Sequence, residues 1–272
     1  NGNYKMNERK LVSTNFQYSD TGQIAFVTFD NAARANCLSC DVINEIRYAF
    51  CALNNNRSLR VIVLESAGKG AFCAGADLKE LSGFDPNKAR AYISALHETI
   101  GAIRTSQVPV IARIQGACIG AGLELAAGCD LRICADNAKF SMPEVELDIP
   151  SVVEAALLPR LIGWGRTSWL LYRGDAIDAH TAKDWGLIEK VVPAEILDGA
   201  IDESSKKLAS NGPTGIRLQK KLMRKWENSF LEQAIEAGID AFAESYSAGD
   251  ANKRIQEAIG KPKHQERGTL KF

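Results

Sequence analysis

The sequence carries no excess of charge of either sign. Its 33 lysines and arginines are balanced by 33 aspartates and glutamates over 272 residues. Proteins held by general attraction to nucleic acid or to an anionic membrane surface need a basic surplus, so the balance argues against both classes. Internal repeats and low-complexity linkers are absent as well, and the 46% hydrophobic content is ample for the core of one large α/β domain, with or without an appendage.

The sequence also lacks long apolar runs. No run approaches the roughly 18 residues that a membrane span requires. The first residues, Asn-Gly-Asn-Tyr-Lys, have none of the apolar core of a secretory signal. We therefore expect a soluble protein of the cytoplasm or of an organelle matrix, mitochondrial or peroxisomal.

Seven cysteines are present, but no metal site is complete. Cys37-x-x-Cys40 has the spacing of half a zinc site, yet no second pair follows, and His97, His180 and His264 lie far away in sequence. We therefore expect no metal. The other cysteines stand among apolar or small residues, which predicts reduced thiols in a core; they are Cys51, Cys73, Cys118, Cys129 and Cys134.

Apolar spacing predicts strands that alternate with helices. Residues 11–18 and 23–29 alternate as two strands paired around a turn, and Ser39 or Asp41 can cap the helix that follows. Strands separated by helices pair in parallel, with right-handed crossovers. Further strands are expected at 61–64, 108–114, 131–135 and 187–192, and helices at 86–105, 152–162, 167–172, 179–185, 194–208, 214–226, 230–247 and 251–259.

A glycine-rich stretch from Ile114 to Asp130 has one carboxylate, Glu124, in its middle. An apolar strand leads into a turn, and good helix formers follow, so the turn should present backbone N–H groups at a helix start. Glu124 lies on the first turn of that helix among apolar residues. Such a carboxylate is either a buried structural acceptor or a catalytic group. A dinucleotide fingerprint does not fit, because Leu125 stands where its third glycine is needed.

Two other segments share these features. Residues 71–81 follow a strand-like run and again place small residues before a helix start. Residues 140–144 hold a second carboxylate, Glu144, beside Pro143 in an apolar setting. Two helix-start turns can supply donors to a developing oxyanion, and two acids in apolar surroundings can serve as an acid/base pair.

These segments together resemble the crotonase family, the enoyl-CoA hydratase and isomerase group. Residues 72–79 read F-C-A-G-A-D-L-K, the unchanged first signature, and residues 116–130 match G-x-x-x-G-x-G-x-E-L-A-x-x-C-D. Pro143-Glu144 follows at the hydratase spacing. The resemblance covers roughly residues 26–192, although the loop from Asp30 to Leu38 keeps only the later Asn and Leu of the family's N-R-P-x-x-x-N-A-L.

The resemblance implies an α/β fold built as a spiral of ββα units. Residues 1–195 would form the core with the CoA-thioester site, and residues 196–272 a helical region that packs into trimers and often hexamers. CoA would be carried by the substrate, with no separate cofactor.

The resemblance also implies roles for single residues, by motif position. The backbone amides of Ala76 and Ala121 would form the oxyanion hole. Ala121 stands where glycine is commoner, which is tolerable if its φ is negative. Glu124 would act on the water and Glu144 on the α-carbon proton. Substrate-binding positions would be Arg34, Ala74, Asp77, Lys79, Gly120 and Val152; Ala74 and Lys79 match the nucleotide end of CoA, while Arg34 and Lys79 can equally be solvated side chains.

One segment departs from the family pattern. Residues 147–158 replace the glycines that follow the second glutamate, and the chain is one residue shorter before Pro150. Bulky Val152 and Val153 should reshape the acyl pocket. Glu154 adds a third acid that either enters the pocket or faces solvent, and the part of Asp148 stays open. A specialised hydratase of secondary metabolism is as consistent with this segment as one of fatty acid metabolism.

Both glutamates together favour a hydratase or dehydratase, a carbon–oxygen lyase. The alternatives are an enoyl-CoA isomerase, or an acyl-CoA hydrolase or decarboxylase, on the same scaffold. An RNA-binding member of the family is a further alternative, because one predicted helix carries a basic cluster. The cluster could also be a surface that receives CoA phosphates, but an apolar stripe at Leu218, Leu222 and Trp226 favours the charged face of an amphipathic helix. The members of the cluster are Arg217, Lys220, Lys221, Arg224 and Lys225.

Overall fold

The computed structural model describes residues 10–247 and 249–260. The chain divides into two compact units, with the division after Ser210. We expected this division after residue 195. The helix α8 (Leu197–Ala209) moves it, because α8 buries Leu197 and Ile201 against the sheet of the first unit.

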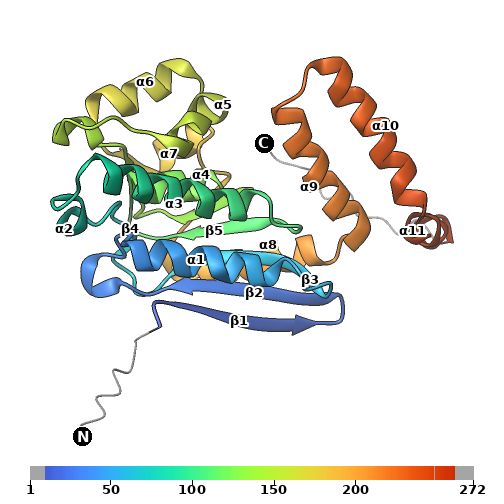
Figure 1. Ribbon diagram of the computed structural model, residues 1–272. Helices are drawn as coiled ribbons and strands as arrows, with labels where there is room; N and C mark the ends of the chain where they lie inside the picture. The colour runs from blue at the N-terminus through green and yellow to red at the C-terminus, as the bar shows by residue number, and fades with distance from the viewer. Residues whose placement is uncertain (1–9, 248, 261–272) are drawn as a thin grey trace, which may run out of the picture. The chain divides into compact units, whose positions relative to one another are not determined.

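The larger sheet of the first unit contains β1 (Val12–Ser19), β2 (Gly22–Phe29), β3 (Leu59–Ser66), β5 (Val110–Ile114), β7 (Leu131–Ala135) and β10 (Lys190–Val192). They lie in the order β1-β2-β3-β5-β7-β10 (Figure 1). β1 and β2 pair antiparallel, and the other neighbours pair in parallel, as the sequence predicts. β3 is buried on both faces, which explains its continuous apolar run.

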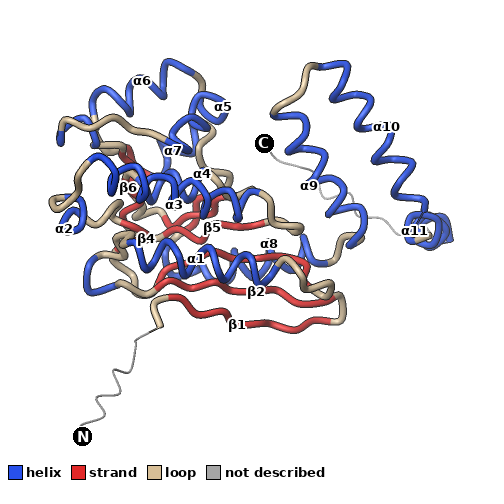
Figure 2. Tube along the Cα trace, in the orientation of Figure 1, coloured by secondary structure: helices blue, strands red, loops and turns tan. Residues whose placement is uncertain are grey.

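Helices cover both faces of this sheet (Figure 1, Figure 2). α1 (Cys40–Leu53) begins after Ser39, whose hydroxyl accepts a hydrogen bond from the Val42 amide, so Ser39 is the predicted cap. The apolar faces of α1 and α3 (Pro86–Arg104) join one core cluster on one face of the sheet, and α8 contributes to a second cluster on the other.

A smaller sheet contains β4 (Ala71–Cys73), β6 (Ala117–Ile119), β8 (Lys139–Ser141) and β9 (Ile177–Asp178), in that order. β4, β6 and β8 pair in parallel. Each follows a strand of the larger sheet and leads into a helical segment: α2 (Leu78–Leu81), α4 (Ala121–Ala127) and η2 (Glu144–Leu147). These successive ββα units confirm the predicted spiral.

The adjacent, parallel arrangement of β4, β6 and β8 has a direct consequence for chemistry. The carboxyl ends of parallel strands lie at one edge of a sheet. The turns that lead into α2, α4 and η2 therefore meet there. These turns hold the residues that the sequence marks as candidates.

The rest of the first unit is helical apart from β9 and β10, and it contains η1 (Ala32–Arg34), η3 (Val153–Leu157), α5 (Leu158–Ile162), α6 (Trp164–Arg173), α7 (Ala179–Asp184) and η4 (Ala194–Ile196). The strand expected at 187–192 begins only at Lys190. The amides of Leu187 and Ile188 donate instead to the carbonyl of Ala182 in α7, so they are not available to the sheet.

The second unit contains α9 (Pro213–Glu227), α10 (Leu231–Ser247) and α11 (Asp250–Gly260), at the positions expected from their amphipathic patterns. The basic cluster lies on α9, but Lys220 is buried rather than solvated like the charged face we predicted. None of the described helices combines the length and the apolar character that a membrane span requires.

All seven cysteines are free thiols. Burial raises the pKa of the Cys73 thiol to about 12. Cys51 is exposed on α1, contrary to the expected core position, because it lies beside the buried stripe through Phe50 rather than on it. Among residues 10–247 and 249–260, no three His, Cys, Asp or Glu side chains gather as a metal site would require.

Candidate active site

Two turns of the small sheet pack backbone against backbone. A Cβ added to Gly122 would lie 2.6 Å from the Cβ of Cys73 and 2.7 Å from its carbonyl oxygen. Gly75 has a φ of +98°, and an added Cβ would lie 3.2 Å from the carbonyl oxygen of Ile119 and 4.0 Å from the Ala121 nitrogen. Glycine is therefore required at both positions, and the start of α4 is held beside the turn after β4.

The Ala76 and Ala121 amides lie on these two neighbouring turns. Ala76 forms a parallel bridge with Leu38, in which the Leu38 amide donates to Gly75 and the Asp77 amide to Leu38. The Ala76 amide takes no part in that bridge. Ala121 is the first residue of α4, where amides have no acceptor within the helix, and its φ is not positive. Ala121 therefore meets the requirement, stated above, that its φ should not be positive.

Glu124 lies on the first turn of α4 and is 4% exposed. Burial raises its pKa to about 8, and the nearby charge of Glu144 acts in the same direction. Glu154 adds a smaller rise, while hydrogen bonding at the backbone of Ala155 and Val152 lowers the pKa. Near neutral pH this carboxyl is therefore mostly protonated, and a pKa close to the working pH suits a group that both gives and takes a proton.

Glu144 begins η2 and is half-buried. Gly120, with a φ of +51°, allows its approach, because an added Cβ at Gly120 would collide with Oε1 of Glu144. The Ser151 hydroxyl donates a 2.8 Å hydrogen bond to Oε2 of Glu144. The two glutamates and the two helix-start turns thus meet at one edge of the small sheet.

The segment that departs from the family pattern forms part of this site. Val153 has a φ of +39°, a strained value for a β-branched residue. Val152 is partly exposed, and it lines a mostly apolar cavity of about 560 Å³ with Val153 and Ala155 of η3 and residues of α5 and α6. Glu154 is buried, so it does not face solvent, but it is not among the residues that line this cavity; Asp148 is exposed.

The candidate substrate-binding residues form a second group. Arg34 of η1 forms an ion pair with the buried Asp77, whose carboxylate also accepts from the Lys79 amide at the start of α2. The Ala74 amide donates to the carbonyl of Ala35, which joins the two loops. Lys79 and Ala74 are exposed. Their role toward CoA stays a prediction.

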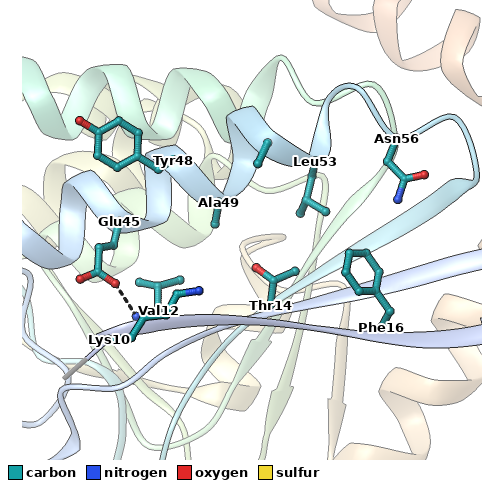
Figure 3. Close-up of a pocket in the computed structure, with 10 residues that line it drawn as sticks. Lys10, Val12, Thr14, Phe16, Glu45, Tyr48, Ala49, Leu53 and Asn56 are labelled. Carbon is teal, nitrogen blue, oxygen red and sulfur yellow. Dashed lines mark hydrogen bonds between the residues drawn. The ribbon is translucent and has the colours of Figure 1, made fainter. Parts of the chain in front are cut away.

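Another cavity, of about 570 Å³, lies between β1 and α1, away from these turns (Figure 3). Its carboxylate, Glu45, is engaged, because Oε2 accepts hydrogen bonds from the amides of Leu11 and Val12. Figure 3 shows apolar side chains such as Leu53 and Phe16 around the rest of it. The described residues that line this cavity include one carboxylate, Glu45, and therefore no acid/base pair of carboxyls.

Comparison with known proteins gives a consistent picture. A family model described as enoyl-CoA hydratase/isomerase matches residues 19–267. The chain belongs to the enoyl-CoA hydratase/isomerase family. It is 31% identical over 244 residues to the short-chain-enoyl-CoA hydratase of Clostridium acetobutylicum, across 89% of this chain and 93% of that protein.

Two further members show the range of the family. The peroxisomal Delta(3,5)-Delta(2,4)-dienoyl-CoA isomerase of Arabidopsis thaliana is 31% identical over 238 residues, 82% of this chain and 84% of that protein. The crystal structure of an enoyl-CoA hydratase from Bacillus anthracis superposes with a TM-score of 0.86 at 32% identity, over 95% of this chain and 99% of that one.

Sequence reasoning missed two residues of the site. Ser151 bonds to Glu144, and His97 of α3 lies 2.8 Å from Glu154 through its Nδ1 atom. Ser151 stands in the segment that differs from the family pattern, so the pattern gave no role for it. His97 lies 57 residues before Glu154, and only the packing of α3 on η3 brings them together.

Removal of the buried acid at residue 124 should change how stability depends on pH. A carboxyl whose pKa rises from 4.5 to about 8 on folding binds more protons when folded, so the free energy of unfolding falls as pH rises between these values. At about 1.4 kcal/mol per pKa unit, the wild type loses a few kcal/mol of unfolding free energy between pH 4.5 and about 8, and Glu124→Gln does not lose it. Urea unfolding at a series of pH values measures this difference.

Glu195→Gln is a matched control, because Glu195 is an exposed acid on η4. Its stability should follow that of the wild type at each pH. If Glu124→Gln and wild type keep a constant difference across the range, the proton affinity assigned to Glu124 is wrong.

Proposed function

We propose that this enzyme catalyses the reversible addition of water to a 2-enoyl-CoA thioester, with Glu124 and Glu144 as its acid/base pair. One observation carries the proposal: parallel pairing of β4, β6 and β8 gathers two candidate amide donors and two carboxyls at one edge. CoA arrives as part of the substrate. The similarity to hydratases over most of the chain supports the same reaction.

The oxyanion is the first requirement of the chemistry. The β-carbon of a conjugated thioester accepts water only when the charge that develops on the carbonyl oxygen is stabilised. The Ala76 and Ala121 amides would bind that oxygen. Fixed donors of this kind contribute about 3–4 kcal/mol each to transition-state stability.

The protons balance between the two carboxyls. Glu124 takes a proton from water as the hydroxyl oxygen bonds to the β-carbon, and Glu144 gives a proton to the α-carbon. Hydration thus ends with Glu124 protonated and Glu144 ionised. Because burial raises the pKa of Glu124, this carboxyl holds a proton in the free enzyme, as the reverse reaction, dehydration of a 3-hydroxyacyl-CoA, requires.

Substitution of each acid should stop hydration but leave different partial reactions. Loss of a positioned acid or base costs about 10²–10⁴-fold in rate. The hydration rates of Glu124→Gln and Glu144→Gln should each be lower than the wild-type rate by that factor. The absorbance band of but-2-enoyl-CoA, which hydration removes, measures these rates. Because Glu144 serves the α-carbon, Glu124→Gln should retain exchange of the α-protons of butanoyl-CoA with deuterated water, whereas Glu144→Gln should lose it.

Glu195→Gln again controls for a change of net charge. Full hydration by either active-site variant would refute the pair. Disappearance of the absorbance band of a 2-enoyl-CoA with formation of a 3-enoyl product, rather than the 3-hydroxy product, would instead identify an isomerase, the activity named for the Arabidopsis relative.

The rate should depend on pH through the same proton. The pair works with one shared proton, and it loses this proton above the raised pKa of Glu124, about 8. We expect kcat/KM to fall about tenfold per pH unit above that value. Hydration consumes no net proton, so the profile should be the same in both directions. A flat profile to about one unit above the Glu124 pKa would contradict this model.

We further propose that the chain assembles as a trimer or a hexamer. Support comes from α10, where Leu231, Ile235, Ile239 and Phe242 recur at three- and four-residue spacing and each is more than half exposed. An apolar stripe of this kind on a helix is normally buried against a partner.

Sedimentation velocity should therefore give a trimer or a hexamer. Phe242→Asp should shift the distribution toward smaller species, because it places a charge in the stripe. Glu232→Lys, an exposed charge change on the same helix, is the control and should sediment like the wild type. A monomeric wild type would exclude this assembly.

A further inference from the structure

The larger sheet ends at β1, and this strand lacks the charge, proline or bulge that normally prevents two sheet edges from pairing. β1 is outermost in the strand order, and its eight residues contain neither a charged side chain nor a proline. It pairs with β2 without a bulge. In the part of the chain that the structure describes, no strand lies on its outer side. The backbone groups of such an edge are available to another strand.

The bonds between β1 and β2 identify the backbone groups at this edge. The Asp30 amide donates to the carbonyl of Leu11, which continues the strand register, so the odd-numbered residues of β1 bond to β2. Inward and outward backbone groups alternate in an antiparallel pair. The even-numbered residues between 14 and 18 therefore direct their N–H and C=O groups outward. The Val12 amide points outward as well, but it donates to Glu45 of α1.

The same residues carry the larger side chains of the edge. Figure 3 shows Thr14 and Phe16 pointing from β1 toward α1, where they line the cavity beside β1. Side chains alternate along a strand, so Tyr18 extends on the same face, and it is 73% exposed. Tyr48 of α1 also lines the cavity and is 64% exposed. Exposed aromatic rings thus lie beside outward backbone groups, a combination that suits an added strand.

The charges at the two ends of β1 indicate which strand fits. Lys10 precedes β1 and Asp20 follows it, and both are exposed. Two copies of β1 that pair antiparallel about Asn15 place each Lys10 opposite Asp20 of the other copy. Opposite charges in such cross-strand positions attract. A shift to the next allowed register separates both charge pairs, so the pattern favours one register of the strand with itself.

This register also matches the residues between the charges. Residues whose backbone groups point outward come to lie opposite one another, as antiparallel pairing requires. Val12 meets Tyr18 of the other copy, so a β-branched side chain packs on an aromatic one. Thr14 meets Phe16 in the same way. Pairs of this kind are among the favourable cross-strand combinations.

We propose that the β1 edge is an interface between two copies of this chain, in which the β1 strands pair antiparallel about Asn15 and join two six-stranded sheets into one. The contact is two-fold, because the same surface serves on both sides. It uses neither the catalytic turns nor the α10 stripe, so it does not depend on the proposed reaction. Together with a three-fold contact it gives a hexamer, and alone it gives a dimer.

Asn15→Cys tests the register directly. In the proposed pairing the two copies of residue 15 are a non-hydrogen-bonded pair, whose Cα atoms approach to about 4.5 Å, close enough for a disulfide. Asn15 is exposed, so the fold should accept the change. Under mild oxidation the variant should form a covalent dimer on a non-reducing gel, and reductant should remove it. The wild type, which has an exposed thiol at Cys51, gives the background.

Ser13→Cys is the matched control. Ser13 is exposed on the same face of β1, but the register places it opposite Gln17 of the other copy. The two thiols would then lie about 13 Å or more apart, and no disulfide should form. Combining Ser13→Cys with Gln17→Cys brings cysteines opposite each other, so this double variant should form the covalent dimer again.

A charge exchange tests the ends of the strand. Asp20→Lys sets lysine against Lys10 in both pairs, so it should weaken the two-fold contact about tenfold and shift sedimentation velocity toward species of half the mass. Adding Lys10→Asp restores opposite charges in exchanged positions and should restore the wild-type distribution. Urea unfolding shows that each variant is folded.

Several results would overturn this interface. One is a disulfide that forms equally well in Ser13→Cys and Asn15→Cys, because it would report random collision. Another is an Asn15→Cys chain that stays uncrosslinked, which would leave the edge to an extended segment of another protein. A wild type that sediments as a trimer or a monomer also excludes the contact. Hydration of but-2-enoyl-CoA is measured separately, so either proposal can fail while the other stands.

Discussion

The site depends on the close approach of two turns that follow neighbouring parallel strands. Gly122 lies so near Cys73 that no side chain fits between them, and Gly75 lies near Ile119 in the same way. The start of α4 is therefore fixed against the turn after β4 by backbone contacts, which are stiffer than contacts between side chains. Donors held in this way need no rearrangement when charge develops on a substrate, and that preorganisation is the main source of oxyanion stabilisation.

The same approach determines the electrostatics of the acids. Because the turns leave little space, Glu124 is enclosed, and its environment favours the protonated form. Gly120 then admits Glu144 to the start of α4, where like charges cannot both be ionised without cost. The Ser151 hydroxyl donates a hydrogen bond to Glu144 and holds its carboxyl in place. The two carboxyls thus have different surroundings although their chemistry is identical, because one is enclosed and the other is half-buried.

Much of this arrangement was predictable from the sequence, for physical reasons that can be named. Alternation and capping located β1, β2 and α1 because these elements are long enough to show a period. The strands of the small sheet, such as Ala71–Cys73, are three residues long, so periodicity could not reveal them. Only the resemblance to the family, through its spiral of ββα units, implied that a second sheet exists. The burial of Glu154 was undecidable from sequence, because it follows Val153, whose positive φ no residue pattern signals.

That strain at Val153 has a structural reason. A left-handed backbone at a β-branched residue costs on the order of 1–3 kcal/mol and persists only where its surroundings hold it. Here the backbone on both sides of Val153, at Val152 and Ala155, is hydrogen-bonded to Glu124, and the next side chain, Glu154, is buried against His97. The segment that departs most from the family pattern is therefore also the one that packs on α4, which carries Glu124, and that contacts the exposed His97.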